Sequence, residues 1–150
     1  MSNCVSLRTA GPDDLRVVEK LLEGAALPVA GVAEWLPQFV VAESEDRIVG
    51  VAGLELYGTS ALLRSVAVEP DWRGSGIGRQ LVDRLLSEAH SRGVHDVYLL
   101  TTTAEHYFPR LGFACVDRDR VPDCVQCSVE FTGACPESAV VMQKTLEKAR

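Results

Sequence analysis

The chain lacks any long apolar run. No stretch of about 18 uncharged apolar residues occurs in its 150 residues, so no membrane-spanning helix is expected. Its first residues, MSNCVSLRTAGPDDL, do not place a basic segment before an apolar one, so the pattern of a secretory signal is absent. We therefore predict a cytoplasmic protein with no membrane partner.

Positive charge is also in short supply. The chain has 15 Lys and Arg against 21 Asp and Glu, which gives a net charge of -6. This balance argues against a protein that coats nucleic acid. It does not exclude an anionic ligand, because a binding site depends on local charges. Hydrophobic content of 47% and charged content of 24% are ordinary for a globular protein.

Cysteines are few and odd in number. The five are Cys4, Cys115, Cys124, Cys127 and Cys135, and in a chain without a secretory signal they are expected to be reduced thiols. Cys124 and Cys127 form a C-x-x-C pair with Cys135 eight residues later, and three thiolates could hold a soft ion. A zinc site needs four ligands, and no nearby His completes one. We predict no metal site, with a thiophilic-metal or arsenic role as the alternative.

No internal repeat, low-complexity tract or linker interrupts the chain, so we expect one domain over residues 1–150. Hydrophobic periodicity predicts strands at residues 5–8, 38–44, 47–58, 60–70, 94–103, 114–119 and 138–146. It predicts helices at residues 11–27, 78–93 and 104–113, with loops or short helices at 28–37 and 121–133. The order is that of a mixed α/β (α+β) protein, in which residues 61–103 form a right-handed parallel crossover.

One stretch, VEPDWRGSGIGRQLVDRLL, places alternating glycines directly before a long helix. Gly74, Gly76 and Gly78 follow Arg73, and the helical pattern starts at once. Small residues let a ligand approach the main chain, and the free N–H groups of a helix N-terminus attract anions. A single glycine would indicate only a tight turn. The repeated glycines together with Arg73 predict a phosphate-binding turn.

Two familiar nucleotide-binding signatures do not fit this stretch. The P-loop requires Lys followed by Ser or Thr, whereas Arg79 follows Gly78. The dinucleotide fingerprint places its glycines after the first strand of a repeated unit, and this turn follows the fourth predicted strand.

The motif Arg-x-x-Gly-x-Gly/Ala does fit, and it resembles the pyrophosphate loop of the GNAT N-acetyltransferase family. The segments LRSVAVEPDWRG and YLLTTTAEHYFPRLGF resemble that family's strand–loop and strand–helix segments in the same order. The resemblance implies the GNAT fold, a mixed six- to seven-stranded central sheet flanked by helices, and acetyl-CoA as co-substrate. The residues it implies for the cofactor are Val66, Ala67, Val68, Arg73, Gly74, Ser75, Gly76, Ile77, Gly78, Arg79 and Phe108.

The catalytic acid and base are less well defined. In this family a tyrosine four residues before the glycine of the GF pair often protonates the leaving thiolate, but that position here is Phe108. Tyr107 is adjacent, although one helical step turns it by about 100°, and a packed aromatic is the alternative. Water could also serve, since thiols are already fairly acidic.

For the base, we consider Glu55 on a strand and Glu105 after the TTT sequence. Glu105 could instead complement a helix dipole, and Glu55 could be a solvated strand residue. His106 is a third candidate because its ordinary pKa is near neutral.

Acceptor binding points first to Arg64, which alternation places on a strand face with otherwise apolar residues. A buried arginine needs an anionic partner, which could be a protein carboxylate or a substrate carboxylate. We predict that Arg64, Thr101 and Thr102 bind the acceptor.

The segments LRSVAV, LLTTTAEHYFPRLGF and CPESAVVMQKTL resemble the acetyltransferase domain of N-acetylglutamate synthases. LPVAGV and CPESAVVM bring the chain closer still to stand-alone N-acetyltransferases of bacterial arsenic-resistance operons. The resemblance implies a small amino-acid-like amine acceptor and a homodimer. A peptide or protein N-acetyltransferase and a non-catalytic sensor of acetyl-CoA or a metalloid are the alternatives.

Overall fold

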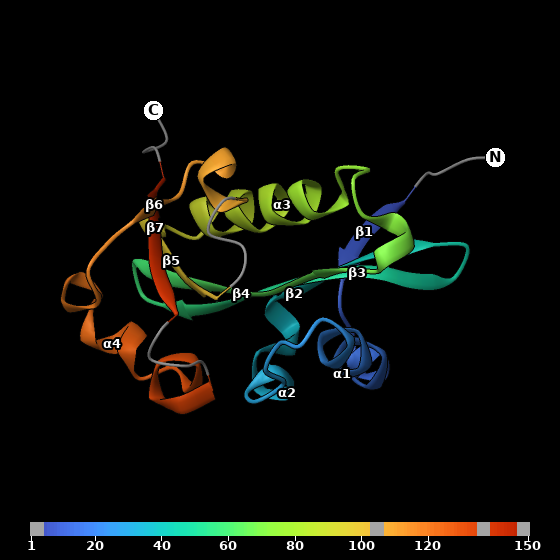
Figure 1. Ribbon diagram of the computed structural model, residues 1–150, viewed down its shortest axis with the longest axis horizontal. Coiled ribbons are helices and arrows are strands. Elements are labelled where there is room, and N and C mark those ends of the chain that lie inside the picture. The colour runs from blue at the N-terminus through green and yellow to red at the C-terminus, as the bar shows by residue number, and fades with distance from the viewer. Residues whose placement is uncertain (1–4, 103–106, 135–138, 147–150) are drawn as a thin grey trace. The chain divides into compact units, whose positions relative to one another are not determined.

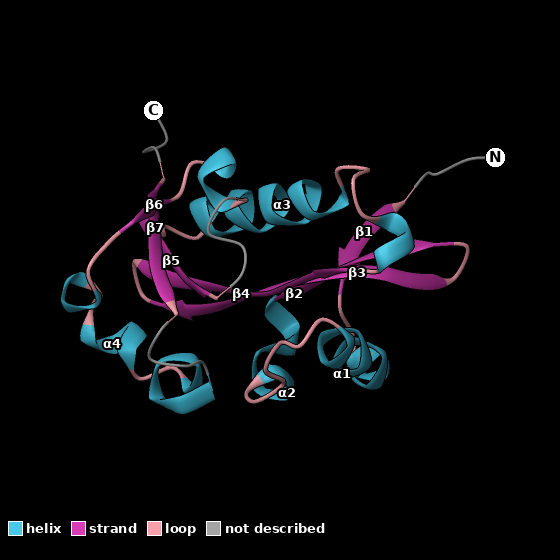
Figure 2. Ribbon diagram, in the orientation of Figure 1, coloured by secondary structure: helices cyan, strands magenta, loops and turns pink. Residues whose placement is uncertain are grey.

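The computed structural model describes residues 5–102, 107–134 and 139–146. In these residues seven strands form a mixed sheet in the order β1-β2-β3-β4-β5-β7-β6 (Figures 1 and 2). The fold class predicted from the sequence is confirmed. The strands are β1 (Ser6–Thr9), β2 (Phe39–Ser44), β3 (Arg47–Tyr57), β4 (Ser60–Val68), β5 (Asp96–Thr101), β6 (Ala114–Cys115) and β7 (Val140–Thr145). The α-helices are α1 (Leu15–Gly24), α2 (Val32–Trp35), α3 (Ile77–Ser91) and α4 (Asp123–Gln126).

Contacts divide the chain into two compact units. The first unit contains Met1–Leu54 and Ser65–Leu85, and the second contains Glu55–Arg64 and Leu86–Arg150. β3, β4 and α3 each run through both units. The expectation of one domain over residues 1–150 stays a prediction.

In the first unit, β1, β2 and β3 form an antiparallel sheet. β1 pairs with β2 from Ser6 opposite Glu43 to Thr9 opposite Val40. Glu45 and Asp46 connect β2 to β3 with φ of 51° and 65°, the left-handed values that a two-residue hairpin turn requires. The strands predicted at residues 38–44 and 47–58 therefore form a hairpin, and a register shift between Ala42 and Glu43 bends its edge.

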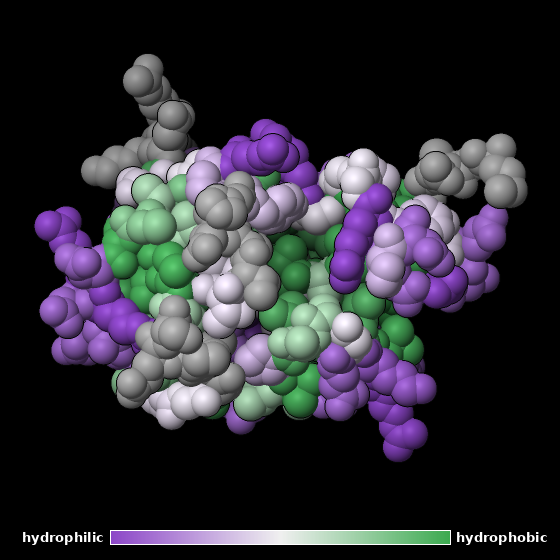
Figure 3. Space-filling model, in the orientation of Figure 1, coloured by the Kyte–Doolittle hydropathy of each residue, from purple (hydrophilic) through white to green (hydrophobic). Residues whose placement is uncertain are grey.

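The core of the first unit lies between this sheet and the helices α1 and α2. α1 has a buried apolar stripe that includes Val18 and Leu22, and hydrophilic residues cover its outer side in Figure 3. These side chains pack with Phe39, Val41 and Val51 of the sheet. The first half of α3 lies on the other side of the strands from α1 and α2 (Figure 1).

The sheet packs so tightly at one point that only glycine fits. A Cβ atom added at Gly53 would lie 2.3 Å from Cε1 of Phe39, whose ring is fully buried. Phe39 and Gly53 face each other across β2 and β3. The aromatic ring therefore occupies the place of the missing side chain.

An ion-pair cluster fixes the start of α1. The Arg8 guanidinium donates to Asp14 Oδ2 at 2.7 Å and to Glu43 Oε2 at 3.2 Å. Asp14 Oδ2 also accepts the amide of Gly11 at 2.7 Å. Arg8 therefore ties the helix start to both β1 and β2.

The second unit contains the parallel part of the sheet. β4 and β5 run parallel from Ser60 opposite Asp96 to Leu62 opposite Tyr98, so the predicted parallel pair is confirmed. β7 then adds antiparallel to β5 over its whole length. Val121 lies just before α4 and Val125 lies on it. Both pack against Leu62, Tyr98 and Val141 of the strands.

Two predicted elements of the second unit differ from the structure. The strand expected at residues 114–119 is reduced to β6 (Ala114–Cys115), because the chain turns into a 3-10 helix at Arg118–Arg120. The helix expected at residues 104–113 is described only from Tyr107 onward, where it is a 3-10 helix, Phe108–Leu111. It ends at Gly112, whose φ of 95° is left-handed.

Candidate functional site

The glycine turn of the first unit is built to expose its main chain. A 3-10 helix at Pro70–Trp72 leads into it, and Ser75 Oγ donates to Trp72 O at 2.6 Å. Gly74 and Gly76 have φ of 83° and 85°, which other residues adopt only at a cost of about 1–2 kcal/mol. The glycines that the sequence placed here are thus needed for the backbone path.

The amides of this turn are available to a ligand. In the described part of the chain, the backbone N–H groups of residues 74–79 make no hydrogen bond to a backbone carbonyl, and the first helical bond is Gln80 N to Gly76 O at 3.0 Å. Residues 73–76 are exposed, whereas Ile77 anchors the turn in the core. The helix that follows has 15 residues, so its N-terminal partial charge is fully developed. These donors fit a diphosphate.

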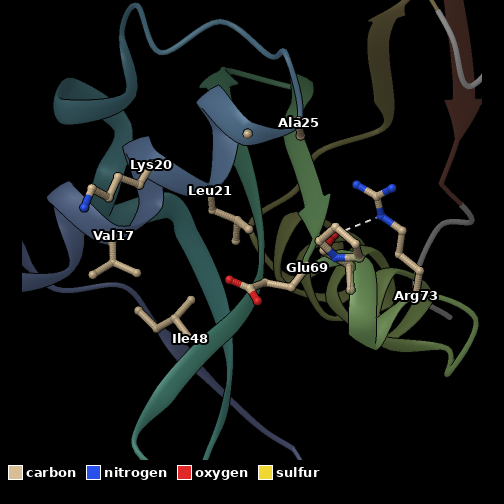
Figure 4. A pocket seen from close by; sticks show the side chains of 10 residues that line it. Val17, Lys20, Leu21, Ala25, Ile48, Glu69 and Arg73 are labelled. Carbon is tan, nitrogen blue, oxygen red and sulfur yellow. Dashed lines mark hydrogen bonds between the residues drawn. The ribbon is translucent and has the colours of Figure 1, made fainter.

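A cavity of about 310 Å³ lies beside the turn in the first unit. Figure 4 shows it between α1 and the end of β4, with the Glu69 carboxylate turned toward Leu21 and Ile48. The Arg73 guanidinium lies on the other side and donates through Nε to Val68 O at 3.1 Å. The lining residues are Val17, Lys20, Leu21, Gly24, Ala25, Ile48, Val68, Glu69, Pro70 and Arg73.

β4 changes character at Ser65. Its pairing with β5 stops at Leu62, although β4 continues to Val68. Ser65 has a φ of 61°, which is rare for a non-glycine residue and typical of strain at functional sites. Beyond it, Val66 and Val68 are half-buried and Ala67 is buried. The strand segment predicted to pair with the cofactor arm is therefore not paired to β5 in the described structure.

The second unit contains a buried charged cluster centred on Arg64. Arg64 is the last residue of β4 that belongs to this unit. The Arg64 side chain is 0% exposed and donates through Nη1 to Glu55 Oε2 at 2.7 Å. Glu130 Oε2 lies 3.6 Å from Arg64 Nη2. The sequence left open whether a protein or a substrate carboxylate pairs with Arg64, and the structure supplies two protein carboxylates. Its contact with an acceptor stays a prediction.

Glu55 is 1% exposed, so the alternative of a solvated strand residue is wrong. Its Oε1 accepts a hydrogen bond from the Tyr57 hydroxyl, and its Oε2 accepts from Arg64. Burial, followed by the hydrogen bond to Glu55, raises the pKa of Tyr57. The phenol thus stays protonated and holds the carboxylate in place. With both oxygens engaged, Glu55 is oriented firmly, and its role as a base stays a prediction.

The other predicted site residues have diverse surroundings. Tyr107 is 36% exposed and its ring meets that of Phe108 edge-on at 5.2 Å. Phe108 is buried and packs against Phe113. Thr101 ends β5 and is half-buried, and Thr102 is exposed. The predicted catalytic residue Glu105 and the candidate His106 lie outside the described residues.

The thiols are only partly described. Cys115, Cys124 and Cys127 are free and exposed, while Cys4 and Cys135 lie outside the described residues. Within residues 5–102, 107–134 and 139–146, no three His, Cys, Asp or Glu side chains gather as a metal site would require. None of the helices in those ranges has the length and apolar composition needed to cross a membrane.

Sequence reasoning missed three members of the buried cluster, namely Tyr57, Ser128 and Glu130. Ser128 and Glu130 are 3% and 5% exposed, in a segment that reads as a polar loop. Ser128 Oγ accepts the amide of Glu130 at 3.1 Å. The one signal available was the predicted buried arginine, which needs an anionic partner but does not indicate which residue supplies it.

The chain is similar to known acetyltransferases. A family model described as an acetyltransferase (GNAT) domain matches residues 36–115, just over half of the chain. An uncharacterised N-acetyltransferase of Chlorobaculum tepidum is 29% identical over 93% of this chain and 96% of its own length. An amino-acid acetyltransferase of Pseudomonas putida is 35% identical over 58% of this chain.

The fold matches more widely than the sequence. N-acetylglutamate synthase of Neisseria gonorrhoeae, solved with coenzyme A and N-acetyl-glutamate, superposes with a TM-score of 0.84 at 19% identity. The match covers 99% of this chain but 36% of the synthase. The chain likewise spans about a fifth of the length of the amino-acid acetyltransferases it matches, 21% for the Pseudomonas protein.

Proposed function

We propose that this chain, which belongs to the GNAT acetyltransferase family, is an acetyl-CoA-dependent N-acetyltransferase whose acceptor is a small amino acid or a close analogue, acetylated on its amine. The observation that carries the proposal is the buried Arg64 on β4, on the same strand as the segment predicted to bind the cofactor. An arginine fully removed from water is suited to a carboxylate ligand. The names of the amino-acid acetyltransferase relatives agree with this class of acceptor.

Acetyl-CoA supplies the acetyl group as a thioester, and solved structural neighbours contain coenzyme A. In this chain, the amides of residues 74–79, which make no backbone hydrogen bond among the described residues, would hold its diphosphate, with Arg73 adding charge. Residues 66–68 of β4, which lie beyond its pairing with β5, would align the pantetheine arm, and Phe108 is also predicted to contact the cofactor. These residues would bind and orient acetyl-CoA. Holding the thioester in place beside the amine supplies much of the rate enhancement of a two-substrate reaction.

The reaction requires few further groups. The amine nitrogen forms a bond to the thioester carbon, the carbon–sulfur bond breaks, and the thiolate gains a proton. The amine must first lose a proton. We assign proton acceptance to Glu55 or Glu105 and proton donation to Tyr107, with Thr101 and Thr102 contacting the acceptor. A homodimer in the cytoplasm remains part of the proposal.

A panel of amine acceptors tests the proposed function. Release of the free CoA thiol is followed with the standard amino acids, their decarboxylated amines, short peptides, and arsenical amino acids. Turnover with one amino acid and none with its decarboxylated amine would support the proposal. Turnover only with peptides would assign the chain to protein acetylation instead. Binding of arsenite without turnover of any amine would favour the sensor alternative.

A further inference from the structure

Arg64 is occupied before any acceptor arrives. Its guanidinium is 0% exposed and lies between Glu55 on β3 and Glu130 in the segment after α4. A substrate carboxylate therefore cannot reach Arg64 unless one of these two side chains leaves. The question is which of them is built to do so.

The two carboxylates contact Arg64 very differently. Glu55 stands on a strand, is 2.7 Å from Arg64, and accepts a second hydrogen bond from Tyr57. Glu130 is 3.6 Å from Arg64, beyond hydrogen-bond distance. Charge-assisted hydrogen bonds are about twice as strong as neutral ones, and Glu130 does not gain one from Arg64 at this distance. Glu130 is the weaker partner of the arginine.

The backbone around Glu130 favours movement of the same side chain. In the segment Glu130–Ala134 the helical path is interrupted at Gly133, whose φ of 146° is non-helical, so the segment is a kinked turn and not one regular helix. The amides of Phe131 and Thr132 both donate to Ser128 O, at 3.0 Å each. These are local bonds, so a shift of this turn breaks no strand pairing that the structure describes.

Charge decides the direction of the exchange. With both carboxyl groups ionised, the buried cluster of Glu55, Arg64 and Glu130 has one positive and two negative charges. A third carboxylate added to it would be strongly opposed, since a buried charge needs its own partner. If the acceptor carboxylate replaces Glu130, the buried charge is unchanged and Glu130 returns to water. Exchange is therefore favoured over addition.

We propose that Glu130 is a specificity-determining residue that occupies Arg64 in the free enzyme and is displaced by the acceptor's carboxylate. The inference rests on the proposed function, because it requires an acceptor with a carboxylate. It assigns to Glu130 the role of an internal competitor. An amine without a carboxylate cannot displace Glu130 and gains nothing from Arg64.

The test compares Glu130→Gln with Asp123→Asn in the full chain. Asp123 is an exposed acid on α4, so its variant controls for the loss of one negative charge from the same unit. KM is measured for the amino acid that the panel identifies, for its decarboxylated amine and for acetyl-CoA. Glu130→Gln should lower the KM of the amino acid about tenfold, which corresponds to about 1.4 kcal/mol. The other two KM values and all those of Asp123→Asn should stay unchanged.

A second measurement does not depend on activity. Addition of the amino acid to the wild-type protein should speed hydrogen exchange at the amides of residues 129–134, whereas the decarboxylated amine should not. In Glu130→Gln these amides should already exchange fast without ligand. Equal exchange with and without the amino acid would overturn the displacement of Glu130.

Failure of the inference can be told from failure of the proposed function. If an amino acid is turned over but its KM is unchanged or raised in Glu130→Gln, Glu130 is no competitor, and the amino-acid acceptor stands. If other amines are turned over and no amino acid is, the proposed function is wrong and the inference falls with it. Thermal unfolding of each variant shows that its fold is retained.

Discussion

The glycine turn and the Arg64 cluster recognise charge in opposite ways. The turn offers main-chain amides of consecutive residues, 74–79, that make no backbone hydrogen bond within the part of the chain that the structure describes, and three of these six residues are glycines without a side chain. The Arg64 cluster is made of side chains that are almost wholly buried, from residues 55, 64 and 130. A site made of backbone depends on local geometry, whereas a site made of buried charges depends on the balance among distant residues.

The largest effect is expected from Gly76→Asp, which tests whether the turn works through its main chain. The new carboxylate would repel a diphosphate, and a side chain at a φ of 85° would strain the turn. Acetyl-CoA affinity, measured by calorimetry, should fall more than 100-fold, about 2.8 kcal/mol. Gly58→Asp is the matched control, because Gly58 is also exposed and left-handed, with a φ of 68°.

The control should keep the cofactor affinity of the wild type. Equal loss in both variants would trace the effect to strain or to net charge, and the contrast between the two regions would then be lost. Gly76→Ala, which adds strain without charge, should give an intermediate affinity.

The next effect concerns stability and tests the buried cluster. Arg64→Met leaves two buried carboxylates without their cation, which typically costs about 3–5 kcal/mol. Urea unfolding should show a loss of that size. Adding Glu55→Gln and Glu130→Gln to the same chain should restore a large part of it, because the unpaired charges are then gone. A small loss in Arg64→Met would mean that the cluster is far better hydrated than its burial indicates.

Tyr107 should have a smaller effect, limited to the rate. Tyr107→Phe is expected to reduce kcat about tenfold to a hundredfold while leaving both KM values unchanged, as loss of a proton donor does. Tyr98→Phe serves as the control, because Tyr98 is a buried tyrosine on β5. An unchanged kcat in Tyr107→Phe would leave thiolate departure to water and would reduce Tyr107 to a ring packed on Phe108.

The smallest effect on stability is expected from replacing Asp14. Its ion pair with the partly exposed Arg8 contrasts with the buried pair of Arg64 and Glu55. The hydrogen bond from Arg8 is the main cause that lowers the pKa of Asp14 below its ordinary value of 3.8. The stabilisation is therefore complete above that ordinary value and is lost as the pH falls through the lower pKa of the folded state.

Asp14→Asn keeps an oxygen for the Gly11 amide but removes the charge. It should lower the free energy of unfolding at neutral pH by about 0.2–1 kcal/mol. The difference from wild type should shrink as the pH falls below 3.8, as measured by thermal unfolding across a pH series. A difference that stays constant with pH would show that the charge of Asp14 is not its source.

The sequence predicted the fold and the turn because both depend on local patterns. Alternation predicted the strands on both sides of Glu45 and Asp46, and the glycine spacing predicted the ligand-binding turn. The strand predicted at residues 114–119 is longer than β6, because the chain turns into a 3-10 helix at Arg118. No change in the pattern of apolar and polar residues marks that turn in the sequence.

The Arg64 cluster could be predicted only in part. Alternation put Arg64 on an apolar face, so a buried cation was expected and found. Its partners come from positions 9 and 66 residues away, and no local pattern distinguishes Glu130 from a solvated acid. Pairing across such separations depends on the packing of the whole unit, which periodicity does not encode.

The contact between Phe39 and Gly53 has a consequence for how this sequence can change over generations. No single replacement at position 53 fits while the ring is present, because the two atoms would be 2.3 Å apart. Substitution at one position is therefore contingent on the other, because a side chain at 53 fits only if the ring at 39 shifts or is replaced by a smaller group. The two positions are expected to change together, which narrows the single substitutions that this sheet tolerates.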